Sequence, residues 1–158
     1  MRVSPLQPKG HVFEEVSVQV QFDENSNPIP AIGFDFAGVR ISCDVGHADV
    51  EEDDSAPSND TMLVSLRFRI LNEEGKKCPY KVTIAASGIF KWLTKETEQE
   101  KRRDLTVVNG ATILYGAIRE MVLTVTARSV SGQLLLPAVN FEDNRPSLLA
   151  KANETTPH

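Results

Sequence analysis

The residue types that carry acid–base or metal chemistry are few in this chain and lie far apart. The three histidines are His11, His47 and His158, and of these His47 has a carboxylate two residues away, on Asp49. Such a pair can hold a cation, but it stands in an acidic stretch whose side chains we expect to face solvent. No histidine or cysteine spacing typical of a zinc site occurs. We therefore predict no metal and no cofactor.

Catalytic motifs are equally scarce. The sequence contains no Gly-x-Ser-x-Gly turn, no phosphate-binding loop, no His-Glu-x-x-His and no Gly-x-Gly-x-x-Gly. The pair Arg119-Glu120 lies in an otherwise apolar stretch, and we interpret it as a structural ion pair, or as a polar contact between helices or subunits, rather than as a catalytic glutamate. We expect no catalytic residue, and we expect that the protein is not an enzyme.

Length and charge limit the class of protein. At 158 residues, a single domain over residues 1–158 is the expectation. The net charge of -5 disfavours a nucleic-acid partner, which would need a basic face. No run of about 18 apolar residues occurs, and residues 1–10 lack the apolar segment of a signal peptide. We expect a cytoplasmic protein without membrane insertion, in which Cys43 and Cys78 are free thiols.

Alternation of apolar and polar residues predicts that strands come first along the chain. The predicted strands cover residues 11–22, 32–45, 61–71 and 79–92. Phe13 is out of phase with Val16, so we expect a bulge or the start of the strand near Glu14. Residues 46–60 are acidic and predict an exposed loop, and we expect disorder at residues 1–10 and 153–158.

The second half of the chain has helical periodicity. A charged helix is predicted over 94–103, and the Asn109-Gly110 pair predicts a break before a second, long helix over 111–129. The β-branched residues in 121–130 leave a strand open as an alternative there. A short helix is predicted at 147–152. Strands followed by helices indicate an α+β fold, a four-stranded antiparallel sheet with a long helix packed on one face.

Apolar side chains are more numerous in this second half than one thin layer would hide. Two interpretations remain open for them: plain core packing, or the lining of an open groove between helix, crossover loop and sheet. The residues concerned are Phe90, Trp92, Tyr115, Leu134, Leu135, Leu136 and Phe141.

Three motifs, in this order and at this spacing, resemble the SecB family of export chaperones. Gly88-Ile89-Phe90 is similar to the end of the family's fourth strand. Ile113-Leu114-Tyr115-Gly116-Ala117-Ile118-Arg119-Glu120 is similar to the start of its long helix, and Leu136-Pro137-Ala138-Val139-Asn140-Phe141 to its crossover loop. Glu15-Val16-Ser17-Val18-Gln19 also resembles the family's first strand.

The resemblance implies an ATP-independent holdase, which binds unfolded or export-bound polypeptides in apolar grooves and does no covalent chemistry. It also implies a homodimer or homotetramer. On this sequence, the implied client-binding residues are Phe90, Leu114, Tyr115, Leu134, Leu135, Leu136, Val139 and Phe141.

Departures from the family pattern concern its partners. Export members dock the motor protein SecA on the flat face of the sheet, and the matching positions are Glu15, Gln19, Lys81 and Thr83, of which one is acidic. A dedicated SecB-like chaperone for an antitoxin or another single client is therefore a second hypothesis. A third is a hot-dog-type thioesterase, in which the helix comes early in the sheet order, whereas here it follows all four strands.

Overall fold

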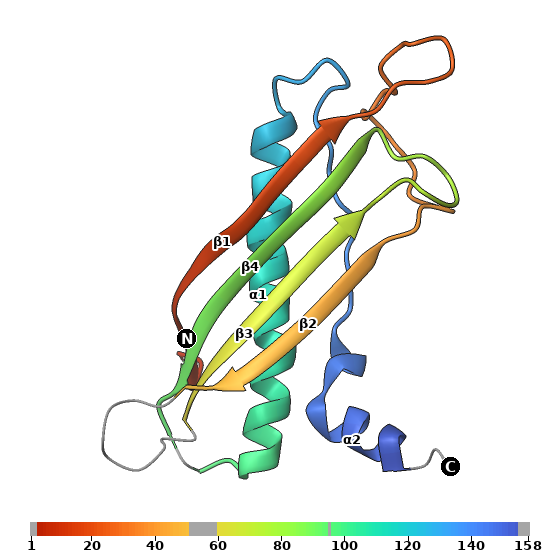
Figure 1. Ribbon diagram of the computed structural model, residues 1–158. Helices are drawn as coiled ribbons and strands as arrows, with labels where there is room; N and C mark the ends of the chain where they lie inside the picture. The colour runs from red at the N-terminus through yellow and green to blue at the C-terminus, as the bar shows by residue number, and fades with distance from the viewer. Residues whose placement is uncertain (1–2, 51–59, 95, 155–158) are drawn as a thin grey trace.

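The protein folds into two layers, a four-stranded sheet and a long helix behind it (Figure 1). The computed structural model describes residues 3–50, 60–94 and 96–154. The elements follow in the order β1 (Leu6–Val20), β2 (Ser42–Asp49), β3 (Thr61–Ile70), β4 (Tyr80–Trp92), α1 (Gln99–Thr126), η1 (Glu142–Asn144) and α2 (Pro146–Glu154). The predicted α+β class, with all strands before the helices, is confirmed.

The sheet is antiparallel, with the strand order β1-β4-β3-β2. The first and last neighbours in this order, β1 and β2, are therefore its edges. The register between β1 and β4 shifts between Phe13 and Glu15, so of the two alternatives expected near Glu14 the structure has the bulge. The register shifts a second time between Pro8 and Gly10. Because side chains alternate across a strand, these shifts decide which β1 residues face the helix.

Several predicted boundaries near the N-terminus were wrong. Residues 6–10, expected to be disordered, form the beginning of β1. The strand predicted at 32–45 begins only at Ser42, because Gly33 and Gly38 have positive φ angles that turn the chain out of an extended path. Residues 46–49 of the predicted acidic loop belong to β2, and 51–59 lie outside the described residues.

The long helix is also different from the prediction. One continuous helix, α1, replaces the two that were expected to meet at Asn109-Gly110. A Cβ on Gly110 would lie 2.9 Å from the Val64 Cγ2 atom and 3.1 Å from the Phe90 ring. This glycine therefore marks close approach of helix and sheet, rather than a helix end. The alternative of a strand over 121–130 is excluded up to Thr126.

The two sheet faces differ sharply in burial. Even-numbered residues of β3 and β4 point toward α1 and form the core together with Leu114, Ile118 and Val122 of the helix. Odd-numbered residues of these strands, with Glu15 and Gln19 of β1, point away from the helix. We call this second side the outer face. Cys43 and Cys78 are free thiols, as predicted.

Candidate functional site

The crossover segment, residues 132–141, runs as extended chain along the flank of α1 (Figure 1). Several hydrogen bonds hold it there. The Tyr115 hydroxyl donates to the Pro137 carbonyl at 2.6 Å, and the Arg119 Nε–H donates to the Leu136 carbonyl at 3.1 Å. Nearer the end of the helix, the Leu134 N–H donates to the Thr126 hydroxyl at 3.0 Å. The Tyr80 hydroxyl donates to the carbonyl of Gly132 at 2.5 Å.

These contacts give Arg119 and Tyr115 structural roles. The guanidinium of Arg119 binds the crossover backbone, so this contact joins α1 to the crossover rather than to a second helix. Burial raises the pKa of the Tyr115 hydroxyl above its ordinary value, Cys43 adds to this, and Arg119 opposes it. The phenol is therefore neutral across the physiological range, and it serves as a hydrogen-bond donor.

The structure brings the predicted groove residues together, but it places most of them inside the single chain. Tyr115 is 4% exposed, and its ring meets the rings of Phe68 and Phe141 at centroid distances of 5.7 and 5.8 Å. The others that are buried are Phe90, Leu114, Leu134, Leu136 and Phe141. In the described chain, these six residues are part of the packed core.

Leu135 is the exception among them. Its neighbours Leu134 and Leu136 point inward and are fully buried, whereas Leu135 is 60% exposed. Val139 is partly buried and packs against the core. The alternation follows from the extended backbone of the crossover, in which successive side chains point to opposite sides. Leu134 and Leu136 thus anchor the crossover in the core, and Leu135 is left exposed to solvent.

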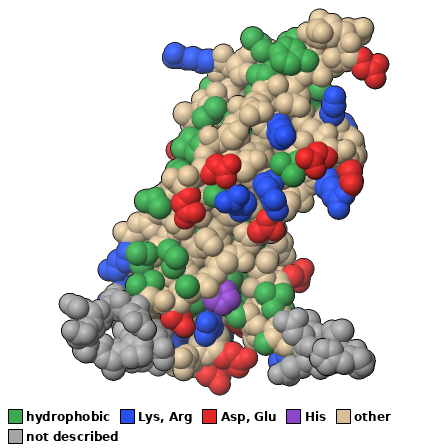
Figure 2. All heavy atoms as spheres, viewed as in Figure 1, with side chains coloured by type: hydrophobic (Ala, Val, Ile, Leu, Met, Phe, Trp, Pro, Cys, Tyr) green, Lys and Arg blue, Asp and Glu red, His purple; other side chains and the backbone are tan. Residues whose placement is uncertain are grey.

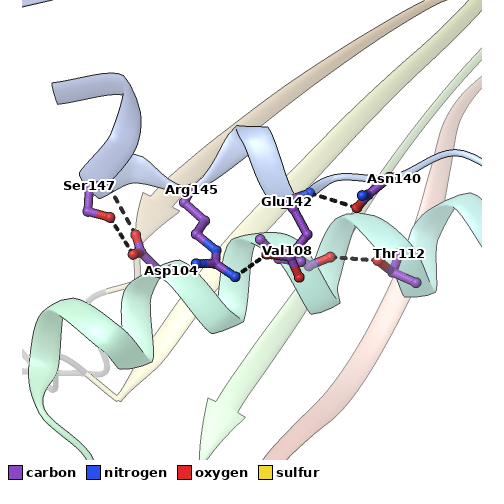
Figure 3. A network of polar contacts seen from close by, with 7 residues as sticks. All are labelled: Asp104, Val108, Thr112, Asn140, Glu142, Arg145 and Ser147. Carbon is purple, nitrogen blue, oxygen red and sulfur yellow. Dashed lines mark hydrogen bonds and ion pairs between the residues drawn. The ribbon is translucent and has the colours of Figure 1, made fainter. Parts of the chain in front are cut away.

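Beyond the crossover, the chain is fastened to the first part of α1 (Figure 3). The carboxylate of Asp104 accepts hydrogen bonds from the Ser147 N–H at 3.0 Å and from the Ser147 hydroxyl at 2.5 Å. Asp104 therefore supplies, from another helix, the oxygen that a capping side chain provides at the start of α2. Arg145 and Glu142 form an ion pair in the same turn. Leu148 and Leu149 of α2 remain about half exposed.

Sequence reasoning missed other exposed apolar residues on the helix side. Val16 of β1 pairs with Ile84 and so faces the helix layer, yet it is 44% exposed. Ile113 and Val125 of α1 are similarly exposed. The helix covers β3 and β4 more fully than it covers β1, which lies at the sheet edge. Strand order, which the sequence does not reveal, is the signal that would have identified this surface.

The residues predicted for motor docking do lie together on the outer face. Gln19 pairs with Lys81, Ser17 with Thr83, and Glu15 with Ala85, so the four predicted side chains share one side of β1 and β4. The carboxylate of Glu15 is 3.4 Å from the Arg67 guanidinium.

His47 and Asp49 instead face the helix side in β2. Asp49 lies 3.5 Å from Arg103, and burial, followed by the charge of Arg103, lowers the pKa of His47. Within the described residues, no cluster of three or more His, Cys, Asp or Glu side chains is placed to hold a metal ion.

Comparison with known proteins is informative about the fold. No protein-family model matches the chain, and no curated protein matches its sequence. A crystal structure of a protein of unknown function from Streptococcus agalactiae is 13% identical, with a TM-score of 0.52, and the match covers 84% of this chain and 97% of the other. This likeness shows a shared fold.

A second solved structure is the SecB-like chaperone of Mycobacterium tuberculosis in complex with a peptide from an antitoxin. It is 16% identical with a TM-score of 0.44, and the match covers 85% of this chain and 91% of the other. In the described residues, no helix is long and apolar enough to cross a membrane.

Proposed function

We propose that this protein is an ATP-independent chaperone of the SecB type, which holds unfolded polypeptides through apolar side chains on its helix side. The observation that carries the proposal is Leu135, an exposed leucine on a segment that is itself firmly held. A rigid apolar anchor loses little conformational entropy when it binds. Each apolar contact with a client contributes at roughly 25 cal/mol per Å² buried.

The surrounding exposed residues support this proposal. Ile113 and Val125 on α1 and Leu148 and Leu149 on α2 leave apolar area open to solvent on the helix side. Contiguous exposed apolar patches mark sites where proteins or ligands bind. The client residues proposed from sequence, Leu135 and Val139 apart, act here as the support that holds this surface in place.

Assembly into homodimers or homotetramers is part of the same proposal. In the described part of the chain, β1 pairs with β4 along one of its sides only. Its two bulges lie before Val16, and residues 16–20 on its free side include no charged residue. Natural edge strands are usually protected by charges, bulges or a covering element. We propose that β1 of a second copy pairs with this edge, and that the partner covers Val16. The native mass by light scattering tests this: a wild-type monomer would contradict it, and Val16→Lys should shift the mass toward the monomer.

A refolding assay tests the chaperone function. The protein should slow the refolding of an unfolded model client at near-stoichiometric ratio, without ATP. Leu135→Asp should abolish the effect, whereas Ala138→Asp, which places the same charge at another exposed crossover position, should retain most of it. Tyr115→Asp is unsuitable, because Tyr115 is buried and the variant would lose stability. A wild-type protein without effect on any unfolded client would contradict the proposal.

A dedicated chaperone for one partner, such as an antitoxin, is the second candidate. The burial of six predicted groove residues favours it, since a small accessible apolar surface suits few clients better than many. Capture experiments distinguish the two: a broad set of unfolded clients indicates a general holdase, and one partner indicates the dedicated role. Docking to SecA receives little support, because the one carboxylate in the predicted row, on Glu15, already pairs with Arg67.

A further inference from the structure

The outer face of the sheet carries an apolar hollow that the proposed client surface does not include. Its volume is about 310 Å³, and Val12, Leu63 and Ile89 supply the apolar side chains around it. Val12 is 61% exposed and Ile89 is 39% exposed, although both stand on regular strands. Figure 2 shows apolar side chains gathered over the lower part of this face, below a belt of charged side chains.

Small residues make the hollow and continue it across the sheet. Ser87 and Gly10 line it, and Ser87 pairs with Ser65 of β3, which in turn pairs with Gly46 of β2. Ser65 and Gly46 line a second hollow, of about 470 Å³, beside the first. A Cβ on Gly46 would lie 2.6 Å from the Ser65 hydroxyl oxygen. The absence of a side chain at Gly46 therefore keeps the second hollow open at this position. Because Ser65 of one hollow pairs with Ser87 of the other, the two hollows are neighbours across the strands, and we refer to them together as the trough.

The charges around the trough are mainly basic. Among the described residues, this face carries five basic side chains, Lys9, Arg67, Arg69, Lys81 and Lys91, and three acidic ones, Glu14, Glu15 and Asp44, which gives 5 − 3 = +2. The whole chain has a net charge of -5. Glu15 pairs with Arg67 at 3.4 Å and Asp44 with Arg69 at 2.5 Å, so these four charges offset one another. Of the described residues that line the apolar hollow, Lys9 is basic and none carries a carboxylate.

We infer that this trough binds an acidic polypeptide segment, in which apolar residues fill the hollow at Val12, Leu63 and Ile89 and carboxylates face the basic rim. Complementary charge selects such a partner and speeds its association. An extended segment suits the site because its side chains alternate, so apolar residues can point into the trough while acidic ones reach its edges. The site lies on the opposite side of the sheet from Leu135, and it does not depend on the chaperone proposal.

Fluorescence anisotropy with two labelled synthetic peptides tests this inference. One peptide alternates leucine with glutamate, and the other alternates leucine with lysine. The full-length protein should bind the glutamate peptide about tenfold more tightly, the equivalent of one or two charge contacts. Ile89→Ser and Val12→Ser should each weaken that binding, and Lys9→Glu should weaken it further at low salt.

Matched controls separate this site from others. Lys101→Glu reverses an exposed lysine on α1 and should leave the affinity unchanged. Leu135→Asp should abolish the chaperone effect while preserving binding of the glutamate peptide, so either proposal can fail alone. Equal binding of both peptides, no binding, or full affinity in Ile89→Ser and Val12→Ser would overturn the inference. A lower native mass for Val12→Ser would also overturn it, because a second copy would then be the occupant.

Discussion

The Trp92 indole Nε1 lies 2.7 Å from the hydroxyl oxygen of Thr106, and that hydroxyl donates in turn to the Arg102 carbonyl at 2.7 Å. This chain of two hydrogen bonds joins the last residue of β4 to the first half of α1. Both Trp92 and Thr106 are buried, so no water replaces either partner without local opening. The two hydrogen bonds therefore connect the first turns of α1 to the C-terminal end of β4.

Thr106→Val should lower the free energy of unfolding by about 1–3 kcal/mol, because the indole N–H would be left buried without an acceptor. Thr112→Val is the matched control. Its hydroxyl also donates to a carbonyl four residues earlier, that of Val108 at 2.8 Å, but it stands on an exposed helix surface. Urea denaturation followed by the fluorescence of Trp92, the single tryptophan, measures both. Equal stabilities for the two variants would contradict this role.

Two glycines of α1 should respond in opposite ways to alanine. Gly110→Ala places a methyl group 2.9 Å from the Val64 Cγ2 atom and should destabilise by about 1–3 kcal/mol. Gly116→Ala meets no atom within 4 Å and should stabilise by about 0.4–1 kcal/mol through the lower entropy of the unfolded chain. Thermal unfolding by circular dichroism decides, and a stable Gly110→Ala protein would show that helix and sheet are not as close as described.

The attachment of α2 should depend on Asp104. Asp104→Ala removes the acceptor for the Ser147 N–H and hydroxyl, at a cost of about 1 kcal/mol for a lost cap. We expect faster amide hydrogen exchange over residues 146–151, with little change in the sheet. Asp143→Ala, an exposed aspartate in η1, serves as the control. Unchanged exchange in α2 of Asp104→Ala would mean that apolar contacts alone hold this helix.

Alkaline pH should destabilise the fold. Burial raises the pKa of Cys43 from 9.0 to about 11, and it raises the pKa values of Cys78 and Tyr115 as well. The folded state therefore holds these protons more tightly than the unfolded state. This contribution to stability is complete below pH 9 and decreases as the pH rises toward 11.

Urea denaturation at pH 8 and pH 10 measures this loss. Cys43→Ala should show a smaller decrease between the two pH values than the wild type, because one of the three groups is removed. A wild-type stability that rises over this interval would contradict the assignment.

The sequence predicted the fold class well because the local patterns agree with it. Alternation through Met62, Val64 and Leu66, all facing the helix, is unambiguous. The single-helix result was missed because Gly110 has a low helix propensity, while its real reason, the nearness of Val64, depends on tertiary structure. The crossover was located correctly, but burial within it alternates residue by residue, so hydrophobicity alone could not separate Leu135 from Leu134.

The late position of the crossover affects how the chain folds during synthesis. The sheet and α1 are complete by Thr126, whereas Leu134, Leu136 and Phe141 emerge afterwards. Until these three residues have emerged, they do not cover the flank of α1 around Tyr115 or the ring of Phe68. On the ribosome, the nascent protein thus exposes an apolar strip of the kind that it is proposed to shield for others, until residues 134–141 have emerged.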